Sequence, residues 1–207
     1  SYSPRAEDAQ GVPISAIVFG GRRASLVPLV FEARDWTHGV LVGASMGSET
    51  TAAATGAVGV MRRDPMAMKP FCGYNFADYF AHWLSFDQPG AKLPKVFHVN
   101  WFRKGEDGQF LWPGFGENLR VLEWMIGRVQ GRVAAVESAI GHLPRAEDLD
   151  MDGITLSAEA RHDLFELDHA GWLAEMRAIH GFLDEHGARM PTQLMAEVRK
   201  TSELLGK

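Results

Sequence analysis

The spacing of apolar residues changes part-way along the chain, and this change limits the folds that the chain can adopt. In the first part, apolar residues fall in short runs that are rich in β-branched residues and lie between glycine or turn residues, a pattern typical of buried strands. The runs that predict strands are 12–19, 26–31, 40–46 and 95–103. From residue 157 onward, apolar residues recur at helical spacing in three segments. The sequence therefore predicts a mixed α+β (α/β) fold with a helical tail.

We expect two parts that belong to one lobe. Residues 1–136 form a Gly-rich α/β part, since most of the 22 glycines precede residue 132. Residues 137–207 form a helical C-terminal extension. At 207 residues, the chain is long enough to bury a core without disulfide bonds.

Two helices and a hairpin are predicted inside the first part. Asn75 is placed to cap a helix over 75–86, and a second helix with one broad apolar stripe begins near Asn118. Between them, an Asp-Gly sequence that separates two β-rich runs predicts a hairpin turn. Residues 43–60 are small almost throughout, which favours either a mobile loop or a short Ala-rich helix.

Composition excludes several classes of protein. A net charge of −5 argues against a nucleic-acid binder that neutralises many phosphates. No apolar run is long enough to cross a membrane, and the N-terminal residues lack the pattern of a signal peptide. The single cysteine, Cys72, cannot form an internal disulfide, which fits a reducing compartment such as the cytoplasm. The chain starts without methionine, so we expect either processing or a longer parent chain.

The common nucleotide and zinc motifs are missing from the sequence. It contains no G-x-x-x-x-G-K-[ST], no G-x-G-x-x-G that opens a helix, no H-E-x-x-H and no paired cysteines. His162, Glu166 and His169 have the spacing of one helical face, which is compatible with a metal site and equally with a solvated helix surface. We assign no metal ligand in this chain.

A candidate anion site follows the first predicted strand. Gly20 and Gly21 precede Arg22 and Arg23 at the strand end. Glycines let backbone amides approach an anion, and arginine binds phosphate through two parallel hydrogen bonds. Ligands of α/β sheets often lie beyond strand ends, although a solvated turn explains the same four residues.

Aromatic residues are densest between positions 101 and 115. The rings are Trp101, Phe102, Phe110, Trp112 and Phe115. Phe115 lies between two glycines in a loop, so its ring needs a partner to cover it. Rings that converge from a hairpin and a loop can sandwich a flat base, and the amide of the nearby Asn118 can read the edge of that base. The alternative is that these rings belong to an ordinary core.

Four segments resemble the carboxy-terminal region of the GTP-dependent phosphoenolpyruvate carboxykinase family. They are FGGRR (19–23), RRDPMAMKPFCGYNFADYFAHWL (62–84), KLPKVFHVNWFRK (92–104) and FLWPGFGEN (110–118). The resemblance runs from about Gly11 through the tail and is densest up to Arg128. The aromatic set is specific to the GTP-using class.

The resemblance implies a fold and an activity. The fold is the nucleotide-binding carboxy-terminal lobe of a carboxykinase. The reaction converts oxaloacetate and GTP to phosphoenolpyruvate, CO2 and GDP, with Mn2+ or Mg2+. The phosphate-binding loop and the metal ligands lie upstream of the matched region, so the partners are the guanine nucleotide, the substrate and the upstream part of the same enzyme. The family implies a monomer.

The resemblance also implies roles for individual residues. Phe102, Phe110 and Phe115 match a guanine clamp, and Asn118 matches the residue that hydrogen-bonds the base. Arg22 matches a phosphate-contacting catalytic arginine. The small-residue segment at about 47–60 matches a mobile lid, although Gly47 and Cys72 replace larger residues of some members. The alternative is that the isolated chain is only a weak nucleotide-binding or structural domain without catalysis.

Overall fold

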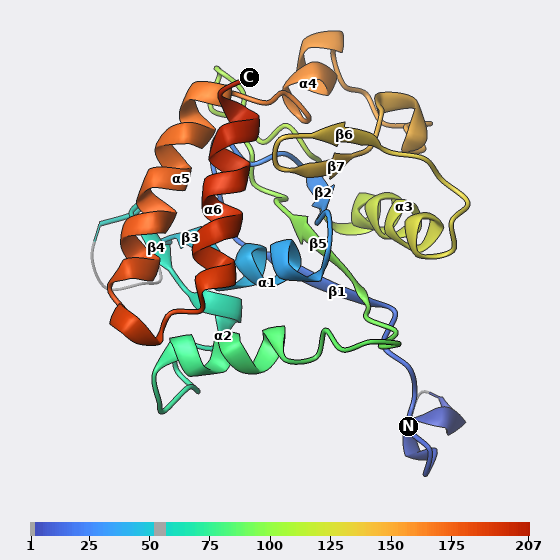
Figure 1. Ribbon diagram of the computed structural model, residues 1–207. Coiled ribbons are helices and arrows are strands. Elements are labelled where there is room, and N and C mark those ends of the chain that lie inside the picture. Colours follow the sequence, from blue (N-terminus) through green and yellow to red (C-terminus); the bar gives the residue numbers. More distant parts are fainter. Residues whose placement is uncertain (1–2, 52–56) are drawn as a thin grey trace.

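The computed structural model describes residues 3–51 and 57–207, and it contains a central mixed sheet (Figure 1). The strands stand in the order β1-β5-β2-β7-β6. Their bounds are β1 Ala16–Gly20, β2 Val30–Glu32, β5 Lys95–Val99, β6 Val136–Ser138 and β7 Gly141–Leu143. β1 and β5 run parallel, whereas the other pairs are antiparallel. A separate antiparallel pair, β3 Gly47–Glu49 and β4 Met61–Arg63, flanks the small-residue segment.

Helices cover the sheet. They are α1 Trp36–Ala44, α2 Phe76–Leu84, α3 Asn118–Val129, α4 Ala158–Asp163, α5 His169–Asp184 and α6 Thr192–Leu205. In Figure 1 the last two helices lie side by side, and α6 also packs against α1. The helices predicted over 75–86, from Asn118 and beyond Ser157 are confirmed. Asn75 caps α2, and its Oδ1 accepts a hydrogen bond from the amide of Ala77 at 2.8 Å.

The prediction of a strand over 40–46 is wrong, because these residues belong mainly to α1. Asp35 caps this helix by accepting from the amide of His38 at 2.8 Å. All of its residues except Thr37 are buried, so the helix carries no polar face and its sequence looks like a buried strand. Gly39 and Gly43 let it approach the sheet, since a Cβ at either position would lie 2.6 Å from a side-chain atom of Val96 or Phe19.

The other predicted strands are shorter than expected. The run at 12–19 forms a strand only from Ala16, the run at 26–31 only from Val30, and the run at 95–103 ends at Val99. The hairpin that follows is present, with an isolated bridge between Lys104 and Phe110. The predicted boundary at 136 falls inside β6. We predicted that the second part, residues 137–207, is a helical extension. It also contributes β7 and most of β6 to the sheet.

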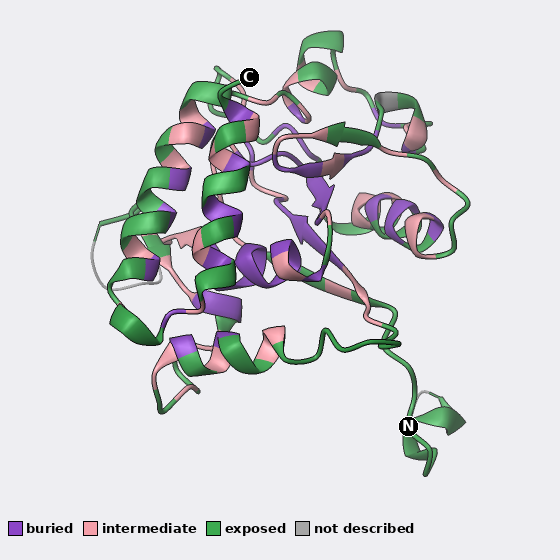
Figure 2. Cartoon of the chain, viewed as in Figure 1, coloured by how far each residue is buried: buried purple, intermediate pink, exposed green. Residues whose placement is uncertain are grey.

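The core lies on both faces of the sheet. Neighbouring residues of one strand point to opposite faces, so Phe31 and Val96 join the cluster beneath α1, α5 and α6, whereas Val30 and Phe97 join the cluster beneath α3. Figure 2 shows that the central strands and α1 are buried almost throughout, whereas α5 and α6 are buried on one side. Within the described ranges, no helix is long and apolar enough to cross a membrane.

Candidate functional site

A cleft of about 490 Å³ opens where the parallel strands β1 and β5 end. One wall is formed by Gly20 at the end of β1, by Gly21 and Arg22 after it, and by Trp101 and Phe102 after β5. The opposite wall is formed by the β3–β4 pair and the residues next to it, namely Ser48, Glu49, Thr50, Thr51, Arg62 and Asp64. A neighbouring hollow shares part of these walls and extends to Lys104 and Phe110. Ligands of α/β sheets commonly bind beyond such carboxyl ends.

The turn after β1 is held tightly against β3. The amide of Arg22 donates to Ser48 Oγ at 3.0 Å, and its carbonyl accepts from the amide of Glu49 at 2.8 Å. Glu49 Oε1 in turn accepts from the amide of Ala24 at 2.8 Å. A Cβ on Gly21 would lie 2.1 Å from the carbonyl oxygen of Gly47, so only glycine allows this approach.

Arginine and phenylalanine side chains meet at the mouth of the cleft. The guanidinium carbon of Arg22 lies 4.3 Å from the centre of the Phe102 ring, a cation–π contact. The Phe102 and Phe110 rings are 5.9 Å apart and nearly perpendicular, and Lys104 Nζ lies 5.3 Å from the Phe110 ring centre. Among the described residues, no carboxylate pairs with Arg22, Arg62 or Lys104. The mouth is therefore both aromatic and positively charged, which suits a planar anionic ligand.

Arg23 points away from the cleft and into the protein. Its backbone is held by Asn100, whose Oδ1 accepts from the Arg23 amide at 3.2 Å and whose Nδ2 donates to the Arg23 carbonyl at 2.9 Å. Its side chain donates to Glu175 Oε1 of α5 at 2.9 Å, and Arg63 of β4 donates to the same oxygen at 2.9 Å. Burial would raise the pKa of the Glu175 carboxyl, but hydrogen bonds and charge from Arg63 and Arg23 outweigh burial and hold this pKa below its usual range.

Comparison with known proteins identifies the family. The family described as "Phosphoenolpyruvate carboxykinase C-terminal P-loop domain" matches residues 1–204. The chain belongs to this family. The resemblance expected from the sequence is thereby confirmed, and the matched range covers the cleft and the helical tail alike.

Three carboxykinases from different organisms are about half identical to the chain. "Phosphoenolpyruvate carboxykinase [GTP]" of Thermoplasma volcanium is 51% identical over 200 residues, which are 97% of this chain and 33% of the relative. The protein of the same description from Chlamydia trachomatis is 52% identical over 206 residues, or 99% of this chain and 34% of the relative. That from Renibacterium salmoninarum is 48% identical over 206 residues, with the same coverage. The chain spans about a third of the length of these relatives.

The structure brings together three of the five site residues that the carboxykinase resemblance implies. Arg22, Phe102 and Phe110 meet at the cleft mouth. Phe115 does not join them, since the residue is 97% exposed and its backbone is left-handed, with φ of 46°. Asn118 begins α3, where its Oδ1 accepts from the indole Nε1 of Trp112 at 2.8 Å, and it does not line the cleft or the neighbouring hollow.

The base of the expected carboxykinase lid is the β3–β4 pair. Thr50 extends the pairing beyond these two strands. Its amide donates to the Val60 carbonyl at 2.9 Å, and its carbonyl accepts from the Gly59 amide at 2.9 Å. Residues 52–56, where a mobile loop and a short helix were the two alternatives, lie outside the described residues.

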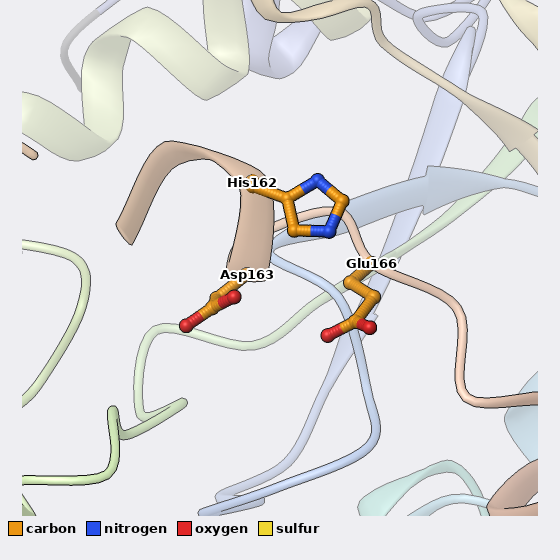
Figure 3. Close-up of side chains that lie close together, drawn as sticks. All are labelled: His162, Asp163 and Glu166. Atoms are coloured by element: carbon orange, nitrogen blue, oxygen red, sulfur yellow. The ribbon is translucent and has the colours of Figure 1, made fainter. Parts of the chain in front are cut away.

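The metal-like cluster of the sequence forms only in part. Ligand atoms of His162, Asp163 and Glu166 lie within 4.8 Å of one another (Figure 3). His169 is not part of this group, because α4 ends at Asp163 and His169 begins α5, where its Nδ1 lies 3.0 Å from the Leu205 carbonyl oxygen. The buried guanidinium of Arg103 donates to the Glu166 carbonyl at 3.1 Å. Positive charge is thus already close to these carboxylates.

Sequence reasoning did not identify Asn100, Glu175 or Arg62 as parts of the site. Asn100 was missed because it lay inside the strand predicted over 95–103, whereas β5 ends at Val99 and leaves Asn100 at its carboxyl end, where ligand-binding groups gather. Arg62 and Arg63 repeat the Arg-Arg pattern of Arg22 and Arg23. Glu175 had no local signal, since its partner Arg23 is 152 residues away along the chain.

Proposed function

We propose that this chain forms the guanine-nucleotide and phosphate-binding part of a GTP-dependent phosphoenolpyruvate carboxykinase. The enzyme converts oxaloacetate and GTP to phosphoenolpyruvate, CO2 and GDP, and is a carboxy-lyase. Family membership and the printed descriptions of the relatives support this activity. The observation that carries it here is the contact of the Arg22 guanidinium with the Phe102 ring at the mouth of the cleft.

The guanine base would bind among the phenylalanines. Phe102 and Phe110 contact each other edge to face, so an entering base separates these two rings and stacks against them. Phe115 is exposed and can close over the base, since each base–ring stack contributes about 1–3 kcal/mol. The Asn118 Nδ2 group can donate to a carbonyl oxygen of guanine, and adenine has no carbonyl oxygen.

Arg22 would act on the transferring phosphoryl group. Loss of CO2 from oxaloacetate leaves an enolate, whose oxygen forms a bond to the γ-phosphorus of GTP while the bond from that phosphorus to the GDP oxygen breaks. The positive charge of Arg22 offsets the negative charge on the equatorial oxygens during this transfer. Arg62 and Lys104 add to the positive potential at the cleft.

Segment 47–60 would serve as a lid over the occupied cleft. The β3–β4 pair that holds its two ends forms one wall of the cleft, so closure of the segment would cover the substrates. A closed lid excludes water, which otherwise protonates the enolate before phosphoryl transfer.

The described cleft residues do not fit a divalent metal ion. The cleft has two acidic side chains, Glu49 and Asp64. Glu49 accepts from the amide of Ala24 and Asp64 accepts from the amide of Lys69, and Arg22 and Arg62 also line the cleft. The Mn2+ or Mg2+ of this reaction would therefore be held by residues outside this chain.

The partners are the guanine nucleotide, oxaloacetate or phosphoenolpyruvate, and the upstream part of the same enzyme. We place the enzyme in the cytoplasm as a monomer.

Substitution of Arg22 tests its role in the complete enzyme. We expect Arg22→Ala to lower kcat by about 100-fold or more, because a positioned charge that acts mainly in the transition state is lost. The affinity for GDP should change by less than about threefold, since the rings and Asn118 remain. Arg145→Ala, at an exposed surface arginine, is the matched control. Equal losses in turnover and in nucleotide binding would contradict the assignment. Absence of any GTP-dependent activity in the unmodified enzyme would favour a binding or structural domain.

A further inference from the structure

One carboxylate of the helical tail holds two arginines from opposite walls of the cleft. Glu175 lies on α5, and its Oε1 accepts from Arg23 Nη1 and from Arg63 Nη1, both at 2.9 Å. The three side chains are only 12–13% exposed, so the cluster is largely shielded from water. An ion pair in such surroundings is costly to break, because the remaining charges are left buried without a partner.

The two arginines belong to two Arg-Arg pairs that are arranged alike. In each pair one arginine lines the cleft, Arg22 from the turn after β1 and Arg62 from β4. The next residue, Arg23 or Arg63, turns inward to Glu175. Successive side chains of an extended segment point to opposite sides, so an anchored second arginine sets the direction of the first.

Further contacts make Glu175 the shared point of attachment. Arg63 Nη1 also donates to the carbonyl of Ser45 at 2.9 Å, at the C-terminal end of α1. The Arg23 backbone is fixed on Asn100. The turn that carries Arg22 and the strand that carries Arg62 are therefore tied to each other, through Glu175, by side chains behind the cleft.

We propose that Glu175 is a positioning residue for phosphoryl transfer. Its carboxylate holds Arg23 and Arg63 together and thereby sets the separation between Arg22 and Arg62, the two arginines that line the cleft. Through β4 it also fixes the end of the small-residue segment at 47–60. This role rests on the proposed function, and it gives the helical tail a part in the chemistry of the cleft.

The chain offers a matched control on the neighbouring helix. Glu197 of α6 is also a buried carboxylate that pairs with an arginine, since Arg34 Nη2 donates to its Oε1 at 2.7 Å. It does not line the cleft. Loss of charge at Glu197 should therefore affect stability in the same way as loss of charge at Glu175, without a specific effect on phosphoryl transfer.

The test compares Glu175→Gln with Glu197→Gln in the complete enzyme. Both variants keep the side-chain shape and remove the charge. For Glu175→Gln we expect kcat to fall by about tenfold or more while the KM for GTP stays within about threefold, because the base pocket is separate from the arginine cluster. For Glu197→Gln both constants should stay within about twofold. Thermal melting of both variants reports the loss of stability.

The outcomes separate the proposals. Equal kinetic constants in the two variants, or a Glu175→Gln variant whose kcat loss is matched by an equal rise in KM, would overturn the positioning role. An inactive unmodified enzyme would instead overturn the proposed function.

If Glu175→Gln does not fold, Arg63→Gln tests the positioning role, since this variant keeps the Arg23–Glu175 pair and releases only β4. A drop in kcat of about fivefold or more at unchanged GTP affinity supports the role, and unchanged kcat contradicts it.

Discussion

At the scale of single residues, the polar groups behind the cleft form a connected set. Asn100 is 1% exposed and satisfies both backbone groups of Arg23, and it also donates to the Val27 carbonyl at 2.9 Å. Two residues earlier, on β5, His98 is buried and stacks on Phe31 with ring centres 5.3 Å apart. Its Nδ1 has no hydrogen-bond partner in the part of the chain that the structure describes. His98 is therefore held in its neutral form.

His98 should make the stability of the protein depend on pH. Burial, with a smaller contribution from Arg23, lowers the pKa of His98 from 6.5 to about 4. The unfolded chain takes up a proton near pH 6.5 and the folded chain does not, so stability is full above pH 6.5 and falls as the pH drops toward 4. This residue alone should remove about 2 kcal/mol of the free energy of unfolding at pH 5.

Urea unfolding at pH 7.5 and pH 5 measures this effect. In the variant His98→Gln, the difference in unfolding free energy between the two pH values should shrink by about 2 kcal/mol. The exposed His180 is the control, and His180→Gln should leave the difference as in the unmodified protein. A pH dependence that is the same with and without His98 would show that this histidine titrates freely in the folded state.

At the scale of elements, sequence patterns predicted the amphipathic helices best. α2, α3, α5 and α6 each carry an apolar and a polar face, and the capping residues Asn75 and Asp168 mark the starts of α2 and α5. α1 was missed because burial on all sides removes the helical period. β6 and β7 were missed because three-residue strands carry too few residues for a pattern, and their place depends on β2, far away in sequence. Contacts between distant segments leave no local signal.

The turn after β1 gives a prediction at this scale. A methyl group at residue 21 would lie 2.1 Å from the Gly47 carbonyl oxygen and would push the turn away from β3. Gly21→Ala should therefore lower the free energy of unfolding by about 1–3 kcal/mol. It should also lower the rate of phosphoenolpyruvate formation, because the shifted turn would strain the hydrogen bond from the Arg22 amide to Ser48.

The control for this substitution is Gly73→Ala. An added Cβ at Gly73 meets nothing within 4 Å, so stability should change by no more than about 0.5 kcal/mol. Urea unfolding and the rate of phosphoenolpyruvate formation provide the two measurements. A Gly21→Ala variant that matches Gly73→Ala in both would mean that β3 does not hold the turn in place.

At the scale of the whole molecule, the helical tail and the Gly-rich part share one core. Phe31 of β2 meets Trp172 of α5 edge to face at 6.4 Å, and Leu183 and Leu194 of the tail are completely buried in the same cluster. The sequence predicted the fold class, and it singled out Arg22, Phe102 and Phe110 as candidate site residues without showing that their side chains meet. It could not predict the order of the strands or the tail's contact with the cleft through Glu175, since both arise from packing between remote segments.

The central claim is that the Phe102–Phe110 mouth binds guanine for phosphoryl transfer. The most direct measurement is the rate of phosphoenolpyruvate formation from oxaloacetate by the complete enzyme with GTP and with ATP. We predict a preference for GTP, and for Phe102→Ala a rise of about tenfold or more in the KM for GTP, which corresponds to the loss of one stacked ring. The exposed Phe86 is the control, and Phe86→Ala should behave as the unmodified enzyme. Equal rates with ATP and GTP, or an unchanged KM in Phe102→Ala, would contradict the claim.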